Sequence, residues 1–186
     1  MPKPYDLTTY DGNRVDELTK AALEATAKRL GYDLTITQGS YNAGGVVASA
    51  GTHDGGGVVD LVAYDYARKV LELRRTGFAA WYRPAIAGLW PAHIHAVLIG
   101  NAKLSSGARA QVAEYLAGYD GLKGDGRDQG PRQFLRNRFT WPKAAPAPKA
   151  SRITKARALL AAAAAHTQHA ARRTKIERAL AALPTK

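Results

Sequence analysis

The stretch that most restricts the fold of this chain is SAGTHDGGGVVDLV, which runs from Ser49 to Val62. It contains four glycines, and glycine lets the backbone turn where residues with a Cβ are strained. His53 lies inside the glycine run, and Asp60 follows seven residues later in an apolar, β-branched segment, 58–64, that is typical of a buried strand. The pattern predicts a tight turn that brings a histidine back toward a strand carrying an aspartate.

A second pair of candidate side chains, His93 and His95, lies in WPAHIHAVL. Segment 92–100 alternates and then becomes apolar, as a central strand does. Residues i and i+2 of a strand share a face, so both imidazoles are expected to project together. Taken singly, each histidine fits a surface or turn position equally well. Taken together with His53 and Asp60, they can supply two imidazoles and one carboxylate to a metal, which is the ligand set of an open catalytic zinc site.

The remaining patterns of the first 142 residues alternate between the helical and the strand period. Helices are expected over 12–32, 64–77 and 105–119, strands over 33–39, 58–64, 78–84 and 92–100, and a polar, glycine-rich loop over 120–133. This order predicts an α+β domain with a small, mainly antiparallel sheet flanked by helices.

The positive charge of the chain is concentrated at its C-terminal end. Residues 143–186 hold ten Lys/Arg and one Glu, whereas residues 1–142 hold seventeen Lys/Arg and fourteen Asp/Glu. Segment 143–150 alternates Ala and Pro, which favours a stiff extended linker, and segment 151–186 is alanine-rich and basic, which favours helix. We therefore expect a domain, a linker and a basic helical tail. The tail predicts an anionic partner: nucleic acid, a membrane surface or a cell-wall polymer.

The composition excludes several classes of site. The chain has no cysteine, so disulfides, thiolate zinc sites and cysteine nucleophiles are excluded, and any metal must be held by histidine and carboxylate. No apolar run approaches the roughly 20 residues of a membrane span. The N-terminus, MPKPYDLTTYDG, lacks the hydrophobic core of a secretion signal, so the protein is expected to be made in the cytoplasm.

The segment SAGTHDGGGVVDL resembles the motif S-x-H-x-x-G-x-A-x-D of the zinc D-alanyl-D-alanine carboxypeptidases and related peptidoglycan endopeptidases. That family includes phage endolysins and shares its fold with the hedgehog signalling domain. The resemblance implies that His53, Asp60 and His95 bind Zn²⁺, and that His93 lies beside the metal as a non-ligand histidine. It covers roughly residues 10–142 and not the tail.

The chain departs from the family at the positions that serve catalysis. Many members have a glutamate three residues before the last histidine as general base, and here that position is Ala92. We expect His93 to transfer the proton instead, because imidazole suits acid–base work near neutral pH. Members also carry an arginine for the substrate carboxylate after the first strand. TQGSYNAGG has none, and neutral hydrogen bonds from Gln38, Ser40 and Tyr41 are expected to replace it.

The resemblance implies a zinc-dependent peptidase that cleaves stem peptides of bacterial peptidoglycan at a D-amino acid. An endolysin-like or carboxypeptidase-like hydrolase without a signal peptide suits a bacteriophage product that acts at the cell wall after release by a holin or delivery in the virion. The alternative is a non-catalytic wall-binding or virion structural protein that keeps the fold, and Ala92 favours it. A nucleic-acid-binding protein is a third interpretation with only the charge of the tail behind it.

Overall fold

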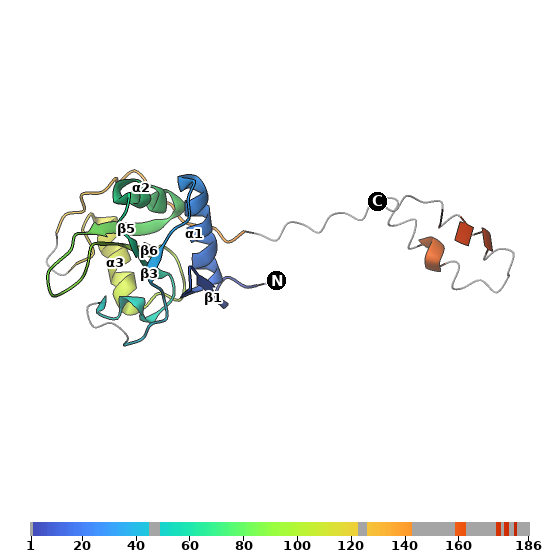
Figure 1. Ribbon diagram of the computed structural model, residues 1–186, viewed down its shortest axis with the longest axis horizontal. Helices are drawn as coiled ribbons and strands as arrows, with labels where there is room; N and C mark the ends of the chain where they lie inside the picture. Colours follow the sequence, from blue (N-terminus) through green and yellow to red (C-terminus); the bar gives the residue numbers. More distant parts are fainter. Residues whose placement is uncertain are drawn as a thin grey trace. The chain divides into compact units, whose positions relative to one another are not determined.

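The structure is a computed structural model of the chain (Figure 1). It describes residues 2–44, 49–122 and 126–142, and within the C-terminal part only residues 159–162, 174–175, 177–178 and 181. The chain divides into two compact units, Met1–Trp141 and Pro142–Lys186. The first unit contains all the elements described below.

This unit is built on a four-stranded sheet in which all neighbouring strands are antiparallel. The strand order is β3-β4-β6-β5, with β3 at Ile36–Gln38, β4 at Val58–Val62, β5 at Phe78–Arg83 and β6 at His93–Leu98. A separate hairpin is formed by β1, Leu7–Tyr10, and β2, Asn13–Asp16. Its two turn residues, Asp11 and Gly12, both have positive φ, as a type I′ turn requires.

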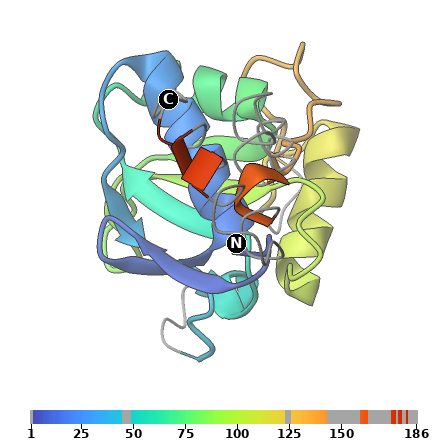
Figure 2. The same ribbon diagram turned by 90° about the vertical axis from the view of Figure 1, so that its right-hand side faces the viewer.

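Three helices cover the two faces of the four-stranded sheet (Figures 1 and 2). The helices are α1 at Glu17–Leu30, α2 at Tyr66–Thr76 and α3 at Ser106–Ala117. The apolar sides of α1 and α2 form the larger core with one face of the sheet. Helix α3 packs on the other face through Ala108 and Tyr115, against Trp81 and Val97. The protein therefore has the α+β fold that the sequence predicts.

Strand alternation decides which side chains lie on the α3 face. In β4, Val59 and Leu61 belong to the core with α1 and α2, whereas Val58 belongs to the core with α3. Asp60 has the same parity as Val58 and therefore lies on the α3 face. Because directly opposite residues of antiparallel strands share a face, the partner of Asp60 on β6, His95, lies there too.

Helix α1 begins at a buried carboxylate. Asp16 is 0% exposed, and its Oδ1 accepts hydrogen bonds from the backbone N–H of Thr19 at 2.8 Å and from the Thr19 hydroxyl at 2.6 Å. Its Oδ2 accepts from the Tyr41 hydroxyl at 3.0 Å and from Nδ2 of Asn101 at 2.9 Å. An N-cap of this kind satisfies a free helical N–H. Here it also ties the start of α1 to two loops that are distant in sequence.

The prediction of a helix from residue 12 is wrong at its N-terminal end. Residues Asn13–Asp16 form β2, and the helix starts only after the Asp16 cap. The apolar spacing of Val15 and Leu18 fits a helix. However, Val15 belongs to strand β2, which follows the tight turn at Asp11 and Gly12, and its side chain is buried there. The predicted Pro/Ala linker and nearly all of the predicted basic tail lie outside the described residues. Within the described part of the chain, no helix has the length and apolar character needed to cross a membrane.

Candidate metal centre

His53 lies in a short 3-10 turn, Thr52–Asp54 (η2), and its side chain is 1% exposed. The glycine run that follows allows a close approach of the backbone to the start of α1. A Cβ on Gly56 would lie 2.4 Å from Oδ2 of Asp16, so only glycine fits there. Nδ1 of His53 lies 2.8 Å from the carbonyl oxygen of Gly39. A carbonyl oxygen can only accept, so Nδ1 carries the hydrogen and Nε2 is the basic nitrogen of the neutral ring.

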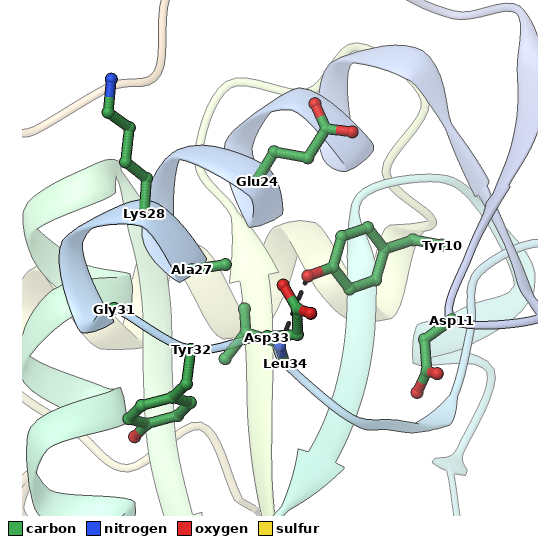
Figure 3. A pocket seen from close by; sticks show the side chains of 9 residues that line it. All are labelled: Tyr10, Asp11, Glu24, Ala27, Lys28, Gly31, Tyr32, Asp33 and Leu34. Carbon is green, nitrogen blue, oxygen red and sulfur yellow. Dashed lines mark hydrogen bonds between the residues drawn. The ribbon is translucent and has the colours of Figure 1, made fainter.

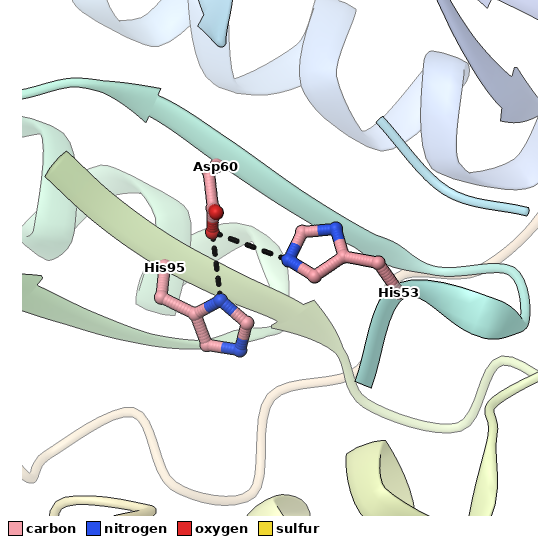
Figure 4. A group of neighbouring side chains, drawn as sticks. All are labelled: His53, Asp60 and His95. Carbon is pink, nitrogen blue, oxygen red and sulfur yellow. Dashed lines mark hydrogen bonds and ion pairs between the residues drawn. The ribbon is translucent and has the colours of Figure 1, made fainter. Parts of the chain in front are cut away.

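Asp60 and His95 are direct cross-strand partners on β4 and β6. Oδ1 of Asp60 lies 2.7 Å from Nδ1 of His95 and 3.4 Å from Nε2 of His53, as the two dashed lines in Figure 4 show. The three potential ligand atoms all lie within 4.8 Å of one another. The structure thus brings together the three residues that the sequence proposes as metal ligands, from one turn and two strands.

His95, like His53, has an acceptor at the ring nitrogen that points away from Asp60. Its Nε2 lies 2.9 Å from Oε1 of Gln111 on α3. The amide nitrogen of Gln111 donates to the carbonyl oxygen of Gly121 at 3.1 Å, which leaves Oε1 as the acceptor facing His95. Nε2 of His95 therefore carries the hydrogen, and Nδ1 is the basic nitrogen of the neutral ring.

In the neutral rings, both basic nitrogens consequently point at the same carboxylate oxygen of Asp60. Lone pairs on three atoms that face one another repel, and a metal ion among them turns this repulsion into attraction. Burial raises the pKa of Asp60, but the hydrogen bonds and charges of His53 and His95 outweigh burial and hold that pKa well below its usual range. The carboxylate is thus kept ionised, as a metal ligand must be.

The protein supplies the surroundings that such centres use. The outward N–H of each imidazole is held by an acceptor, a backbone carbonyl for His53 and a side-chain amide for His95. Partners of this kind fix the orientation of metal-binding histidines. The indole of Trp81, the partner of His95 on β5, stacks on the His95 ring with centroids 6.2 Å apart. The residues present therefore fit a metal ion in both donor type and support.

His93 lies on the same face of the sheet, one residue pair further along β6, opposite Val62 and Arg83. Two residues along a strand correspond to about 7 Å. The side chain is half-buried, and its Nδ1 lies 2.8 Å from the carbonyl oxygen of Pro91. Nδ1 therefore carries the hydrogen of the neutral ring, and Nε2 is left as its basic nitrogen. The strand geometry thus places His93 two residues along β6 from His95 and outside the converging set.

The three predicted substrate-binding residues have different surroundings. Gln38 on β3 pairs with Asp60 across the strands, is partly exposed, and donates to the Ser49 hydroxyl at 3.0 Å. Ser40 is buried, and its hydroxyl donates to the carbonyl oxygen of Val58 at 2.7 Å. The Tyr41 hydroxyl donates to Asp16, and burial, together with the charge of that carboxylate, raises the Tyr41 pKa well above its usual range. Of the three, only Gln38 lies on a strand next to the centre.

Two side chains between α3 and the sheet are not singled out by the sequence. Gln111 contacts His95 from α3, although nothing in the helical pattern around it marks it as special. Arg83 is 5% exposed, lies over the ring of Trp81 at 5.1 Å from its centroid, and donates to the carbonyl oxygen of Asp120. Burial lowers the pKa of Arg83, and the surrounding carboxylates, Asp120 first, oppose that shift. A sequence pattern could not pair these residues with the centre, because they come from elements far apart along the chain.

A pocket of about 700 Å³ lies away from the centre, between α1 and the β1–β2 turn (Figure 3). Its lining includes Tyr10, Asp11, Glu24 and Asp33, and none of the three converging residues. The Tyr10 hydroxyl accepts from the backbone N–H of Leu34 at 3.4 Å, and Asp11 accepts from another backbone N–H on the same segment. These hydrogen bonds attach the β1–β2 hairpin to the start of β3, so Tyr10 and Asp11 stabilise the fold on this side of the pocket.

Comparison with known proteins gives no family. The chain matches no protein-family model, no curated protein and no solved structure. What the molecule offers is a small α+β fold with a buried His-Asp-His group that could bind a metal ion. Its function has to be argued from these residues.

Proposed function

We propose that the protein is a zinc-dependent peptidoglycan peptidase that cleaves stem peptides at a D-amino acid. The observation that carries the proposal is the convergence of His53, Asp60 and His95, whose ligand atoms lie within 4.8 Å of one another. The seven-residue spacing of His53 and Asp60 and the HxH segment supply the resemblance to zinc peptidases of the cell wall.

The donor set favours zinc over the other common metals. Two imidazole nitrogens and one carboxylate are the donors of open catalytic zinc sites, whereas Mg²⁺ and Ca²⁺ prefer oxygen donors throughout. When bound, zinc supplies Lewis-acid activation of water and of the scissile carbonyl group. His53 through Nε2, His95 through Nδ1 and the Asp60 carboxylate would hold it.

The chain's own residues supply the remaining functions. His93 lies on the same face of the sheet, and its Nε2 is the basic nitrogen of the neutral ring. It takes a proton from the attacking water and passes this proton to the amine that leaves. Gln38, beside Asp60, hydrogen-bonds the substrate backbone. Trp81 covers one side of His95 and excludes water there. Substrate contacts by Ser40 and Tyr41 stay a prediction, since both hydroxyls already make internal hydrogen bonds.

The second candidate is a non-catalytic cell-wall-binding or virion structural protein that keeps the fold and the metal. Ala92, at the position where zinc peptidases of this kind carry a glutamate, favours it. In both candidates the basic segment 151–186 is an electrostatic anchor to an anionic wall polymer. Both place the protein at the bacterial cell wall, as a bacteriophage product made in the cytoplasm. Nucleic acid is the competing partner of the basic segment.

The test combines metal analysis with digestion of purified peptidoglycan. The wild-type protein should carry one zinc per chain and release peptides that mass spectrometry identifies by their cleaved bond. His53→Ala/His95→Ala should lose both properties. Full zinc content in the double variant would refute the assigned centre. Zinc binding without release of peptides from any wall substrate would favour the non-catalytic candidate.

A further inference from the structure

Gln111 links helix α3 to the candidate metal centre. It lies on the side of α3 that faces the sheet, and its Oε1 is 2.9 Å from Nε2 of His95. This contact is on the edge of the imidazole that points away from Asp60, because the other ring nitrogen, Nδ1, is the one 2.7 Å from Oδ1 of Asp60. Gln111 therefore does not belong to the converging donor atoms and acts on them only through His95.

The orientation of the Gln111 amide is fixed at its other end. Its Nε2 donates to the carbonyl oxygen of Gly121 at 3.1 Å. A backbone carbonyl cannot accept from Oε1, so the amide cannot turn over without losing both hydrogen bonds. The acceptor end is thereby held toward His95.

The Gly121 carbonyl is itself part of an anchored segment. Three consecutive backbone carbonyl oxygens accept from side chains that lie between the sheet and α3. Tyr119 accepts from Nε1 of Trp81 at 3.3 Å, Asp120 from Arg83, and Gly121 from Gln111. Gly121 has a φ of +74°, and a Cβ there would lie 3.0 Å from the Trp81 ring. The segment therefore lies close against the indole that stacks on His95, and its position is set by the same face of the sheet that carries the centre.

We propose that Gln111 is a positioning residue for the metal, selecting the tautomer of His95 whose basic nitrogen is Nδ1. Without the acceptor, neutral His95 can place its hydrogen on Nδ1 and donate it to Asp60, which removes one of the three metal ligand atoms. Carboxylate or carbonyl acceptors behind a metal-binding histidine are typical of such centres, and their removal costs about 10–100-fold in metal affinity. Here a glutamine supplies the acceptor. This inference rests on the proposed zinc site.

The test uses Gln111→Met, which keeps length and helix propensity but removes the acceptor, and Gln111→Glu, which keeps an acceptor. Gln133→Met, on an exposed turn, is the matched control. Zinc affinity is measured by competition with a chelator. The tautomer of His95 is read in the metal-free protein from long-range ¹H–¹⁵N NMR over a series of rising pH, at the values where the spectra themselves show a neutral ring.

Gln111→Met should bind zinc about 10–100-fold more weakly and lose the single Nε2–H tautomer of His95. Gln111→Glu should keep that tautomer and lose less affinity, and Gln133→Met should match the wild type. Wild-type zinc affinity and an unchanged tautomer in Gln111→Met would overturn the inference and leave the zinc site standing. A wild-type protein that binds no zinc would overturn both. If Gln111→Met does not fold, loss of the Nε2–H tautomer in folded Gln111→Glu would refute the inference by itself.

Discussion

Asp60→Asn is the substitution that tests the metal centre most directly, because it keeps the shape of the side chain and removes its charge. Oδ1 of Asp60 is the atom that both imidazoles face, at 2.7 and 3.4 Å. Structural zinc typically contributes about 10–16 kcal/mol shared among four ligands. One carboxylate then accounts for about 2.5–4 kcal/mol, which corresponds to a loss of roughly 10²–10³ in affinity.

The loss can be read from thermal unfolding with and without zinc. At free zinc of about 1,000 times the wild-type Kd, binding stabilises the folded protein by about 4.1 kcal/mol. A variant that binds a thousandfold more weakly gains only about 0.4 kcal/mol at the same zinc concentration. For a domain of this size 1 kcal/mol shifts Tm by about 2–4 °C. The wild type should therefore shift by roughly 8–16 °C on that scale, and Asp60→Asn by about 1–6 °C over the expected range of affinity loss.

The matched control is Asp54→Asn, since Asp54 is an exposed acid directly after the proposed ligand His53. It should keep the wild-type response to zinc. An equal zinc-induced shift in Asp60→Asn and the wild type would refute the assignment of the carboxylate as a ligand, whatever the activity of either protein.

Three further perturbations address the proton donor, the Asp16 cap and the behaviour at alkaline pH. His93→Ala should retain zinc and lose peptidoglycan hydrolysis by about 10²–10⁴-fold; unchanged turnover would assign proton transfer to another group. Tyr41→Phe removes a hydrogen bond to the buried carboxylate of Asp16, so urea unfolding should show a loss of about 1.5–3 kcal/mol, while a raised KM without that loss would support a substrate contact instead. Burial, then the hydrogen bond and charge of a neighbouring carboxylate, raises the pKa of Tyr32 from 10.0 to about 12. The unfolded chain therefore loses this proton first, and stability should fall between pH 10 and 12 in the wild type but less in Tyr32→Phe.

The candidate centre could be predicted from the sequence because it depends on local rules. The alternation of side chains along a strand puts His93 and His95 on one face, and the glycine run marks the turn that returns His53 to Asp60. These rules need no knowledge of which strands are neighbours. The pairing of β4 with β6 supplied the remaining step, and it brought Asp60 directly opposite His95.

Other features depend on tertiary packing or on a signal with two interpretations. The β1–β2 hairpin follows from the Asp11-Gly12 pair, a strong two-residue turn signal, but the apolar positions beside it also fit the start of a helix. Gln111 is an ordinary helix-forming residue, and only the packing of α3 over the sheet brings it to His95. Arg83 is similar, because its burial over Trp81 is a property of the assembled face.

The direct opposition of Asp60 and His95 also bears on which length changes the chain tolerates. Deleting one residue within β6 would shift its alternation by one and present Ile94 or Ala96 to Asp60 in place of a histidine. Insertions in the connection between β5 and β6, residues 84–92, leave that pairing intact. Related sequences should therefore differ in the length of that connection. Strands β4 and β6, which carry Asp60 and His95, should show substitutions but no insertions or deletions.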